Sequence, residues 1–321
     1  MLMAQDMQRV RISLDHFEGN GGFDFISHAH SDHIGAAKRS SNIISTPQTA
    51  QLIEAAYNIS ITTLSISKGI NLIPAGHMLG SSQLLVNDAV SNEQIVYTGD
   101  FQMSKSKANG IIEVPKVDTV ILDSTFCTPD ILFGPKEDTY REIVEWAKFS
   151  SQKGPVIFSA YKMGKAQEII YALNEANITP IVSKKIAKIN QVYIKNNIPL
   201  NYYCPSLGDG VDELKSNFIG ITEQRELPML KKVISSMNNC TVHTAHVSGF
   251  AKIFNYNCDA QFTLSDHADF AQSISYIKQS GAKKVYTYGK NSGEFARNLC
   301  LYGIDAKPLP DSHIEFALNI K

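Results

Sequence analysis

The chain alternates between short, nearly continuous apolar runs and longer segments in which apolar residues recur at helical spacing. Runs of the first kind predict buried strands where polar residues bound them. They cover residues 23–27, 94–101, 118–126, 154–161 and 285–289. The first three of these runs have histidine, aspartate or serine at or near their ends, so candidate functional side chains are expected at the strand ends.

Segments of the second kind predict helices, and they cover residues 138–150, 164–177, 269–281 and 294–303. In the third of them Phe270, Ile274 and Ile277 share one face. Gly281 follows as a typical carboxyl-terminal stop. We find no internal repeat and no low-complexity linker. This order of strands and helices indicates a layered α/β or α+β fold.

Composition narrows the class of protein. The 321 residues are 43% hydrophobic and 19% charged, which suits two globular domains or one large domain with an insertion. Five scattered cysteines without a C-x-x-C pair favour a reduced, cytoplasmic setting. The amino terminus lacks a signal-peptide pattern, and no apolar run predicts a membrane span. With a net charge of −1, a nucleic-acid partner would have to be held by local basic patches or by metal.

The strongest chemical signal is a histidine cluster, HAHSDH at residues 28–33, directly after a predicted strand. His28 and His30 point the same way in an extended chain. Asp32 and His33 come at a turn that we expect to lead toward a helix, so their side chains can face a different position in space from those of His28 and His30. Imidazole and carboxylate are the ligands that Zn²⁺ prefers, at about 2.0–2.1 Å for nitrogen. A polar turn that is rich in histidine by chance is the alternative, which the concentration of these residue types disfavours.

The cluster matches the H-x-H-x-D-H signature of the metallo-β-lactamase superfamily, and two later phrases extend the resemblance. PAGHMLGSS supplies His77, and YTGDF supplies Asp100. The resemblance implies an αββα sandwich with two metal positions. The ligands it implies for the first are His28, His30 and His77. Those it implies for the second are Asp32 and His33, with Asp100 between the two metals.

A long segment separates LDSTFC (122–127) from LSDHADF (264–270). This resembles the β-CASP nucleases, in which an α/β domain is inserted into the metallo-β-lactamase domain. The boundaries we predict are 1–128, 129–262 and 263–321. In that family Asp123 would be the motif A carboxylate and His267 the motif B histidine, a candidate general acid that the carboxylate orients. Asp32 is a third catalytic candidate, because it could orient the attacking water.

The expected substrate depends on which members of the β-CASP family the sequence motifs of this chain resemble. ISLDHF, FISHAHSDH, LIPAGH, VYTGDF and LDSTFC resemble Artemis-type DNA-repair nucleases, whereas AYKMGKAQE and LSDHADF resemble ligase-associated DNA exonucleases. RNA-processing members usually have glutamate at motif A and histidine at motif C, where this chain has Asp123 and Tyr288. The resemblance favours a DNA exonuclease over an RNA-processing nuclease. A non-catalytic scaffold is disfavoured, because six of the seven usual ligands are present.

Tyr288 also affects how tightly a second metal ion is expected to bind. A neutral tyrosine, with a pKa near 10, is a poor zinc ligand at neutral pH. We therefore expect one tight zinc, at His28, His30 and His77, and a second metal that binds weakly or arrives with substrate.

Phosphate contacts are predicted at two places. Gly164 and Lys165 open a helix after a strand, with Lys162 beside them, so backbone N–H groups and lysine could meet a phosphate. Ser124 and Thr125, which follow the motif A carboxylate, are the other candidates. An ordinary strand–turn–helix with a solvated lysine is an equal alternative for the first place.

Overall fold

We describe the protein from a computed structural model, which describes residues 7–19, 22–65, 69–215, 217–310 and 313–319. The chain forms two compact units. Unit 1 comprises Met1–Lys105, Gly110–Leu132 and His267–Lys321, and unit 2 comprises Ser106–Asn109 and Phe133–Asp266. The predicted domain boundaries, after residues 128 and 262, fall a few residues before these divisions and stay predictions for the domains themselves.

Unit 1 contains two sheets. The smaller has the strand order β15-β1-β2-β3. Its strands are β1 (Met7–Leu14), β2 (Phe23–Phe25), β3 (Ile43–Ile44) and β15 (His313–Asn319). The larger has the order β14-β13-β7-β6-β5-β4. Its strands are β4 (Ile70–Pro74), β5 (Ser82–Asn87), β6 (Gln94–Tyr97), β7 (Thr119–Asp123), β13 (Lys284–Tyr288) and β14 (Asp305–Pro308).

Side-chain alternation in the larger sheet creates two separate cores. Ile121 of β7 packs between the two sheets with Phe25 and Ile314 from the smaller one. Its neighbours Val120 and Leu122 point to the opposite face. Because both faces of β7 are buried, its sequence is a continuous apolar run rather than an alternating one.

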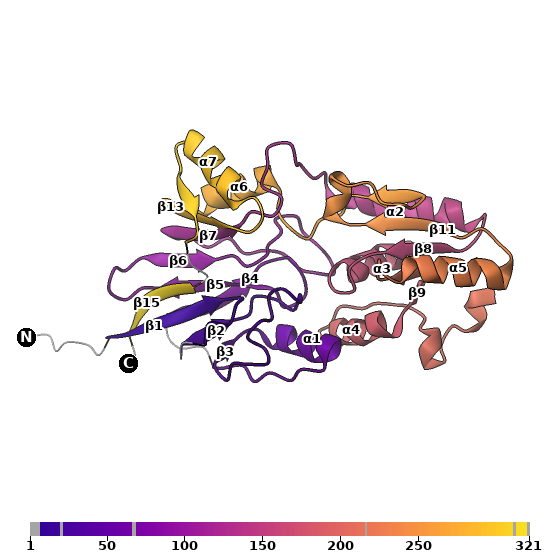
Figure 1. Cartoon of the computed structure of the whole chain (residues 1–321), viewed down its shortest axis with the longest axis horizontal. Coiled ribbons are helices and arrows are strands. Elements are labelled where there is room, and N and C mark those ends of the chain that lie inside the picture. The colour runs from indigo at the N-terminus through magenta and orange to yellow at the C-terminus, as the bar shows by residue number, and fades with distance from the viewer. Residues whose placement is uncertain (1–6, 20–21, 66–68, 216, 311–312, 320–321) are drawn as a thin grey trace, which may run out of the picture. The chain divides into compact units, whose positions relative to one another are not determined.

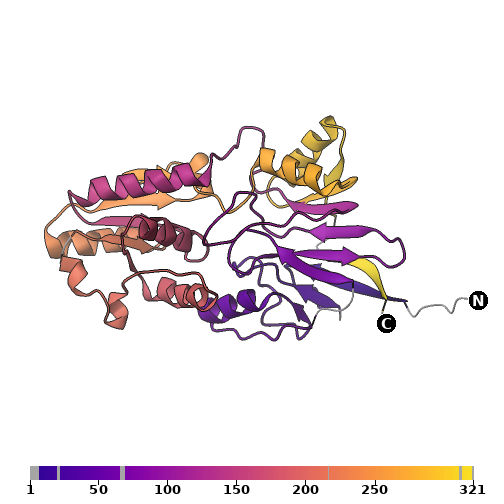
Figure 2. The same cartoon turned by 180° about the vertical axis from the view of Figure 1, so that it is seen from behind.

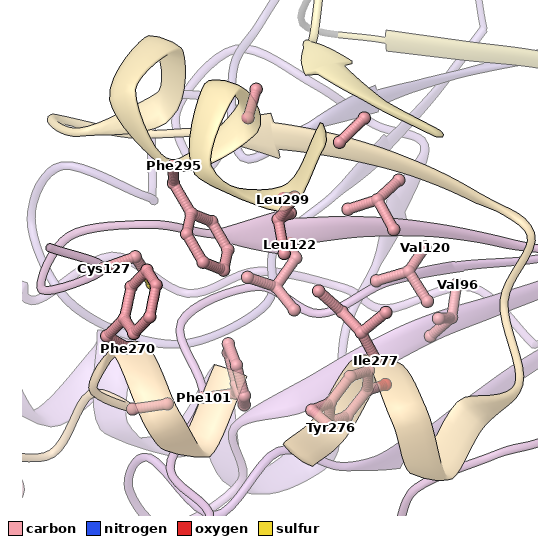
Figure 3. Packing of buried hydrophobic residues seen from close by; sticks show 14 of the residues in the cluster. Val96, Phe101, Val120, Leu122, Cys127, Phe270, Tyr276, Ile277, Phe295 and Leu299 are labelled. Atoms are coloured by element: carbon pink, nitrogen blue, oxygen red, sulfur yellow. The ribbon is translucent and has the colours of Figure 1, made fainter. Parts of the chain in front are cut away.

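The outer face of the larger sheet is covered by α6 (Phe270–Ser280) and α7 (Ser292–Leu301). Their buried side chains, including Phe270, Tyr276 and Phe295, meet Val120 and Leu122 of the sheet (Figure 3). A capping box at Asp269 begins α6, and a left-handed Gly281 ends it, as predicted. Helix α1 (Pro47–Tyr57) lies beside the smaller sheet, on the side away from α6 and α7 (Figures 1 and 2). In unit 1 the two sheets therefore pack face to face, and α6 and α7 cover the outer face of the larger one.

Unit 2 is built on a five-stranded sheet of order β12-β11-β8-β10-β9, in which all neighbouring strands pair in parallel. Its strands are β8 (Val156–Ser159), β9 (Ile181–Val182), β10 (Ile219–Thr222), β11 (His243–Val247) and β12 (Ala260–Phe262). Its α-helices are α2 (Lys136–Ser151), α3 (Lys165–Glu175), α4 (Lys184–Lys195) and α5 (Leu227–Asn238). Short 3₁₀ turns lie at Pro205–Leu207, Asp212–Lys215 and Gly249–Lys252. Parallel strands need crossover helices, which the strand–helix alternation supplies.

All four predicted helices and five predicted strands are present, and four of the strands, β2, β6, β7 and β8, are shorter than predicted. β2 ends at Phe25 and β6 at Tyr97, so the polar residues that follow lie in loops. The expectation that Asp32 and His33 turn toward a helix is wrong. Turns occupy this region, and the next helix, α1, begins at Pro47.

Among the described residues, no helix combines the length and apolar character needed to cross a membrane. The expectation on the amino terminus concerns residues 1–6, which lie outside the described ranges.

Candidate metal centre

The candidate site lies where loops leave the ends of several strands of unit 1. His28 follows β2, His77 follows β4, Asp100 follows β6, and Asp123 is the last residue of β7. Glycine lets these loops approach closely. Gly99 has φ +54°, and a Cβ there would lie 2.6 Å from Ser27 Cβ. The glycine of the YTGDF phrase therefore brings Asp100 against the histidine loop.

Four predicted ligands converge: His28, His30, His77 and Asp100 form one group able to hold a metal ion. His30 Nδ1 lies 3.1 Å from His28 Nε2 and 3.1 Å from His77 Nε2. Asp100 Oδ2 is 3.5 Å from His28 Nε2 and 3.9 Å from His77 Nε2. Ligands about 2.1 Å from a tetrahedral zinc stand about 3.4 Å apart. The donor set and its spacing therefore fit zinc.

The hydrogen bonds of Ser27 determine which ring nitrogen of His28 carries the proton, and the other nitrogen presents a lone pair to this centre. The Ser27 hydroxyl donates its only proton to Asp15 Oδ2, 2.8 Å away. His28 Nδ1, 2.9 Å from the same hydroxyl, must then be the donor of that pair. Nε2 is left as an acceptor turned toward His30 and Asp100. Partners of this kind fix the tautomer of metal-ligating histidines.

Asp15 is a residue of the site to which sequence reasoning assigned no role. It is buried, has φ +59°, and accepts hydrogen bonds from Ser27 N–H at 2.7 Å and the Tyr97 hydroxyl at 2.8 Å. His33 Nδ1 also lies 2.8 Å from its carboxylate, which directs His33 Nε2 to within 3.3 Å of Asp100. The ISLDHF phrase was the available signal, but only the fold shows what the carboxylate holds.

The electrostatics of the centre favour a neutral His28 beside an ionised Asp100. Burial, reinforced by His33 and His77, lowers the pKa of His28 well below its usual value. Burial alone would raise the pKa of Asp100, but His33 and His267 hold it well below its ordinary range. His28 is thus a ready metal ligand, and Asp100 supplies the negative charge that a cation needs.

His33 and Tyr288 have raised pKa values. For His33, burial alone would lower the pKa, but Asp100 and Asp15 raise it well above its usual value. The pKa of Tyr288 is raised well above its usual value by burial, then by Tyr97, Asp123 and Asp100. Tyr288 therefore stays a neutral phenol at physiological pH.

Asp123 and His267 form a second arrangement beside the first. His267 Nδ1 lies 2.8 Å from Asp123 Oδ2. The other oxygen of Asp123 accepts from the Thr125 hydroxyl at 2.7 Å and from Thr125 N–H at 3.0 Å. The carboxylate is fixed on both sides, and His267 Nε2 is turned toward Asp100 at 3.7 Å. Asp100, Asp123 and His267 also form a group able to hold a cation.

Three other predicted residues take places with different partners. Asp32 has a 79% exposed side chain, and its carboxylate lies 3.7 Å from His33 Nε2. Ser124 is fully buried, and its hydroxyl donates to the carbonyl of Tyr288. The Thr125 hydroxyl is engaged by Asp123. Roles for Asp32 as ligand and catalyst, and for Ser124 and Thr125 as phosphate contacts, stay predictions.

Within unit 2, Lys165 belongs to a buried cluster of four charges. Its Nζ lies 2.6 Å from Asp266 and 3.6 Å from Glu168. Lys136 Nζ lies 2.7 Å from Glu168 and 3.8 Å from Asp266. Burial alone would raise the pKa of Asp266, but Lys165 and Lys136 hold it far below its ordinary value. A phosphate contact by Lys165 would have to replace this pairing. That role, and those of Lys162 and Gly164, stay predictions.

We expect Lys165→Met to lower the free energy of unfolding by about 3–5 kcal/mol, because it leaves two buried carboxylates with one cation. Lys107→Met is the matched control. Lys107 also pairs with a carboxylate of unit 2, Glu175, at 2.7 Å, but both side chains are more than half exposed. Denaturant unfolding at neutral pH measures both variants. Equal effects of the two substitutions would contradict a structural role for the buried cluster.

Comparison with known proteins finds relatives at low sequence identity. No protein-family model matches the chain. A probable DNA ligase of Opitutus terrae is 26% identical over 313 residues, covering 92% of this chain and 29% of the ligase. The DNA cross-link repair protein SNM1 of Arabidopsis thaliana is 28% identical over 164 residues, 46% of this chain and 33% of that protein. An RNase J-like protein of Methanocaldococcus jannaschii is 25% identical over 183 residues, 46% of this chain and 42% of that protein.

These relatives and the layered α/β architecture confirm the predicted fold class and the predicted resemblance to the metallo-β-lactamase superfamily. Within that superfamily, the chain resembles the β-CASP nuclease family. The aligned region is less than half the length of each of these three relatives.

Proposed function

We propose that this chain is a zinc-dependent nuclease that hydrolyses phosphodiester bonds of nucleic acid, acting on DNA in preference to RNA and as an exonuclease. The observation that carries the proposal is the convergence of His28, His30, His77 and Asp100 at spacings that suit a tetrahedral zinc, beside the paired Asp123 and His267. A bound zinc would act as a Lewis acid and lower the pKa of a coordinated water to about 7.

The chain's own residues account for the remaining steps. The carboxylate of Asp123 fixes the ring of His267 through Nδ1, so that Nε2 faces the reacting region. A positioned imidazolium can give a proton to the leaving 3′-oxygen. Ser27 and Asp15 hold His28 and His33 in place during the reaction.

The preference for DNA rests on Asp123 and Tyr288, where RNA-processing members usually have glutamate and histidine, and on two relatives that are named for DNA ligation and DNA repair. An RNA-processing nuclease is the second candidate, which similarity to an RNase J-like protein favours. A non-catalytic scaffold is the weakest, because the predicted ligands are retained and four of them converge.

End-labelled single- and double-stranded DNA and RNA of one sequence separate these candidates. We expect zinc-dependent release of mononucleotides from DNA, faster than from RNA, and its loss in EDTA. Faster cleavage of RNA would support the second candidate. No cleavage of any substrate by fully metal-loaded protein would support the scaffold.

Metal content gives a further prediction. With Tyr288 at the motif C position, a second metal would have one protein ligand fewer than the first, and its shell would need water or phosphate. After exhaustive dialysis we expect nearer one zinc than two per chain by elemental analysis. Tyr288→His should raise the affinity of the second position by adding an imidazole. Two tightly retained zinc ions in the wild type would contradict this expectation.

A further inference from the structure

Gln102 is a buried residue two positions after Asp100, and its main chain packs against the loop that carries His77. Its N–H donates to the carbonyl of Ala75 at 3.1 Å. A Cβ on Gly76, which has φ +73°, would lie 2.7 Å from the carbonyl oxygen of Gln102. This close approach places the Gln102 backbone beside two segments that supply candidate metal ligands, the loop after β4 and the loop after β6.

The side-chain amide of Gln102 extends this contact to a third segment. Its Nε2 donates to the main-chain carbonyl of His267 at 2.7 Å. At the other end of the amide, Oε1 accepts from the N–H of Ser104 at 2.8 Å, and the Ser104 hydroxyl accepts from Gln272 Nε2 at 3.0 Å. A carbonyl can be met only by the nitrogen of an amide, and an N–H only by its oxygen. The amide therefore has one orientation, with its donor directed at His267.

The peptide between His267 and Ala268 is held at both of its polar groups. Gln102 donates to the carbonyl, and the N–H of Ala268 donates to the carbonyl of Phe101 at 2.7 Å. Because a peptide group is planar, these two hydrogen bonds fix the plane that follows the Cα of His267. The direction in which the imidazole leaves the main chain is thereby fixed as well.

The imidazole of His267 depends on this support because its side chain is partly exposed, at 20%. The ring has an edge contact with that of His77, at a centroid distance of 4.8 Å. Its Nδ1 meets Asp123 at 2.8 Å, and its Nε2 stands 3.7 Å from Asp100. The Asp123 hydrogen bond holds the ring itself, and the Gln102 amide holds the main chain from which the ring extends.

We propose that Gln102 is a positioning residue for His267: its amide holds the peptide that follows His267, so that the imidazole reaches both Asp123 and the reacting phosphate. This inference rests on the proposed function, in which His267 is the general acid. Catalysis by a positioned group is sensitive to its placement, and a displacement of about 1 Å can cost about 10²-fold in rate. Since Gln102 belongs to the same loop as Asp100, one short segment sets a metal ligand and the proton donor relative to each other.

Gln102→Met tests the inference, because methionine has a similar volume but neither the donor nor the acceptor of the amide. We expect turnover on DNA to fall about 10- to 100-fold, with zinc content unchanged. A p-nitrophenyl phosphodiester, whose phenolate leaves without a proton, should be hydrolysed by this variant with far less loss. In a His267→Ala background the substitution should cost no further activity on DNA, since both changes act through the same ring.

Gln83→Met is the matched control. Gln83 is also buried in unit 1, where its Nε2 donates to the carbonyls of Pro74 and Glu113 at 2.8 and 2.6 Å and its Oε1 accepts from the Tyr276 hydroxyl. Both substitutions remove a buried amide that is hydrogen-bonded at both ends, so denaturant unfolding should show a loss of stability in both. Only Gln102→Met should change the ratio of activities on DNA and on the p-nitrophenyl substrate.

Undiminished turnover on DNA, an equal loss on the two substrates, or a further loss in the His267→Ala background would overturn the inference. If Gln102→Met does not fold, Gln102→Glu repeats the test, because it keeps the acceptor for Ser104 and places an oxygen opposite the His267 carbonyl.

Proton NMR gives a second readout that needs no catalysis. The Nδ1 proton of His267, assigned by its absence in His267→Ala, should shift or broaden in Gln102→Met and stay unchanged in Gln83→Met. If the wild-type protein holds zinc yet cleaves no phosphodiester, the proposed function fails, and this spectrum still decides whether Gln102 positions His267. An unchanged resonance in Gln102→Met would overturn the inference.

Discussion

Replacing His77 with alanine should abolish tight zinc binding and reduce phosphodiester hydrolysis by at least about 10³-fold, since a bound metal supplies several kcal/mol of transition-state stabilisation. His77 is buried, its Nε2 faces His30 and Asp100, and it joins a loop after β4 to the cluster after β2. Its loss leaves His28 and His30 as the only histidines of the four-residue group. Elemental analysis and hydrolysis of end-labelled DNA measure the two effects.

His313→Ala is the matched control for His77→Ala. His313 lies in unit 1 near Glu18 and Arg11, and it belongs to neither group of candidate ligands found among the described residues. The His313→Ala variant should keep both its zinc and its hydrolytic activity. Unfolding of the two variants in EDTA shows whether either merely loses its fold. Retention of zinc by His77→Ala, or loss of zinc from His313→Ala, would contradict the assignment.

His267→Ala should lower turnover by about 10²–10⁴-fold while changing zinc content little, if His267 is the general acid. The reason lies in its geometry. Nδ1 is held by Asp123, and Nε2 faces the centre from outside the group formed by His28, His30, His77 and Asp100. Asp123→Asn should reproduce much of the loss, because the amide cannot orient the ring as a carboxylate does. The double variant should be little worse than His267→Ala, since the two residues act as a unit.

A substrate with a better leaving group separates proton donation from metal binding. A p-nitrophenyl phosphodiester expels a stable phenolate that needs no proton, so His267→Ala should lose far less activity on it than on DNA. An equal loss on both substrates, together with a loss of zinc, would instead make His267 a ligand in the group with Asp100 and Asp123.

Sequence patterns were sufficient for most elements that frame the centre. β7 and β8 are continuous apolar runs because both of their faces are buried, and α6 carries its own start and stop signals at Asp269 and Gly281. Short strands such as β3, with two residues, carry too little pattern to be seen. The turn after His33 was misjudged because helix signals were expected directly after it, whereas α1 begins only at Pro47.

Within the site, the residues that touch one another across long sequence distances were the hardest to foresee. The histidine motif pointed to His28 and His30, but nothing local indicates that Asp15 holds both Ser27 and His33. The sequence places Lys165 at a helix start, where a phosphate contact and a solvated lysine are equal alternatives. Only the fold shows that Asp266, about a hundred residues later, neutralises it in the interior. Pairings of this kind depend on topology, which a single sequence does not encode locally.

The most direct test of the central claim is zinc-dependent hydrolysis by metal-stripped protein. The protein should cleave no end-labelled DNA after treatment with EDTA, and added zinc should restore cleavage in parallel with occupancy of the first site. His77→Ala, titrated in the same way, should stay inactive. Cleavage that persists in the stripped protein, or that zinc restores equally in His77→Ala, would contradict the assignment of a zinc centre to His28, His30, His77 and Asp100.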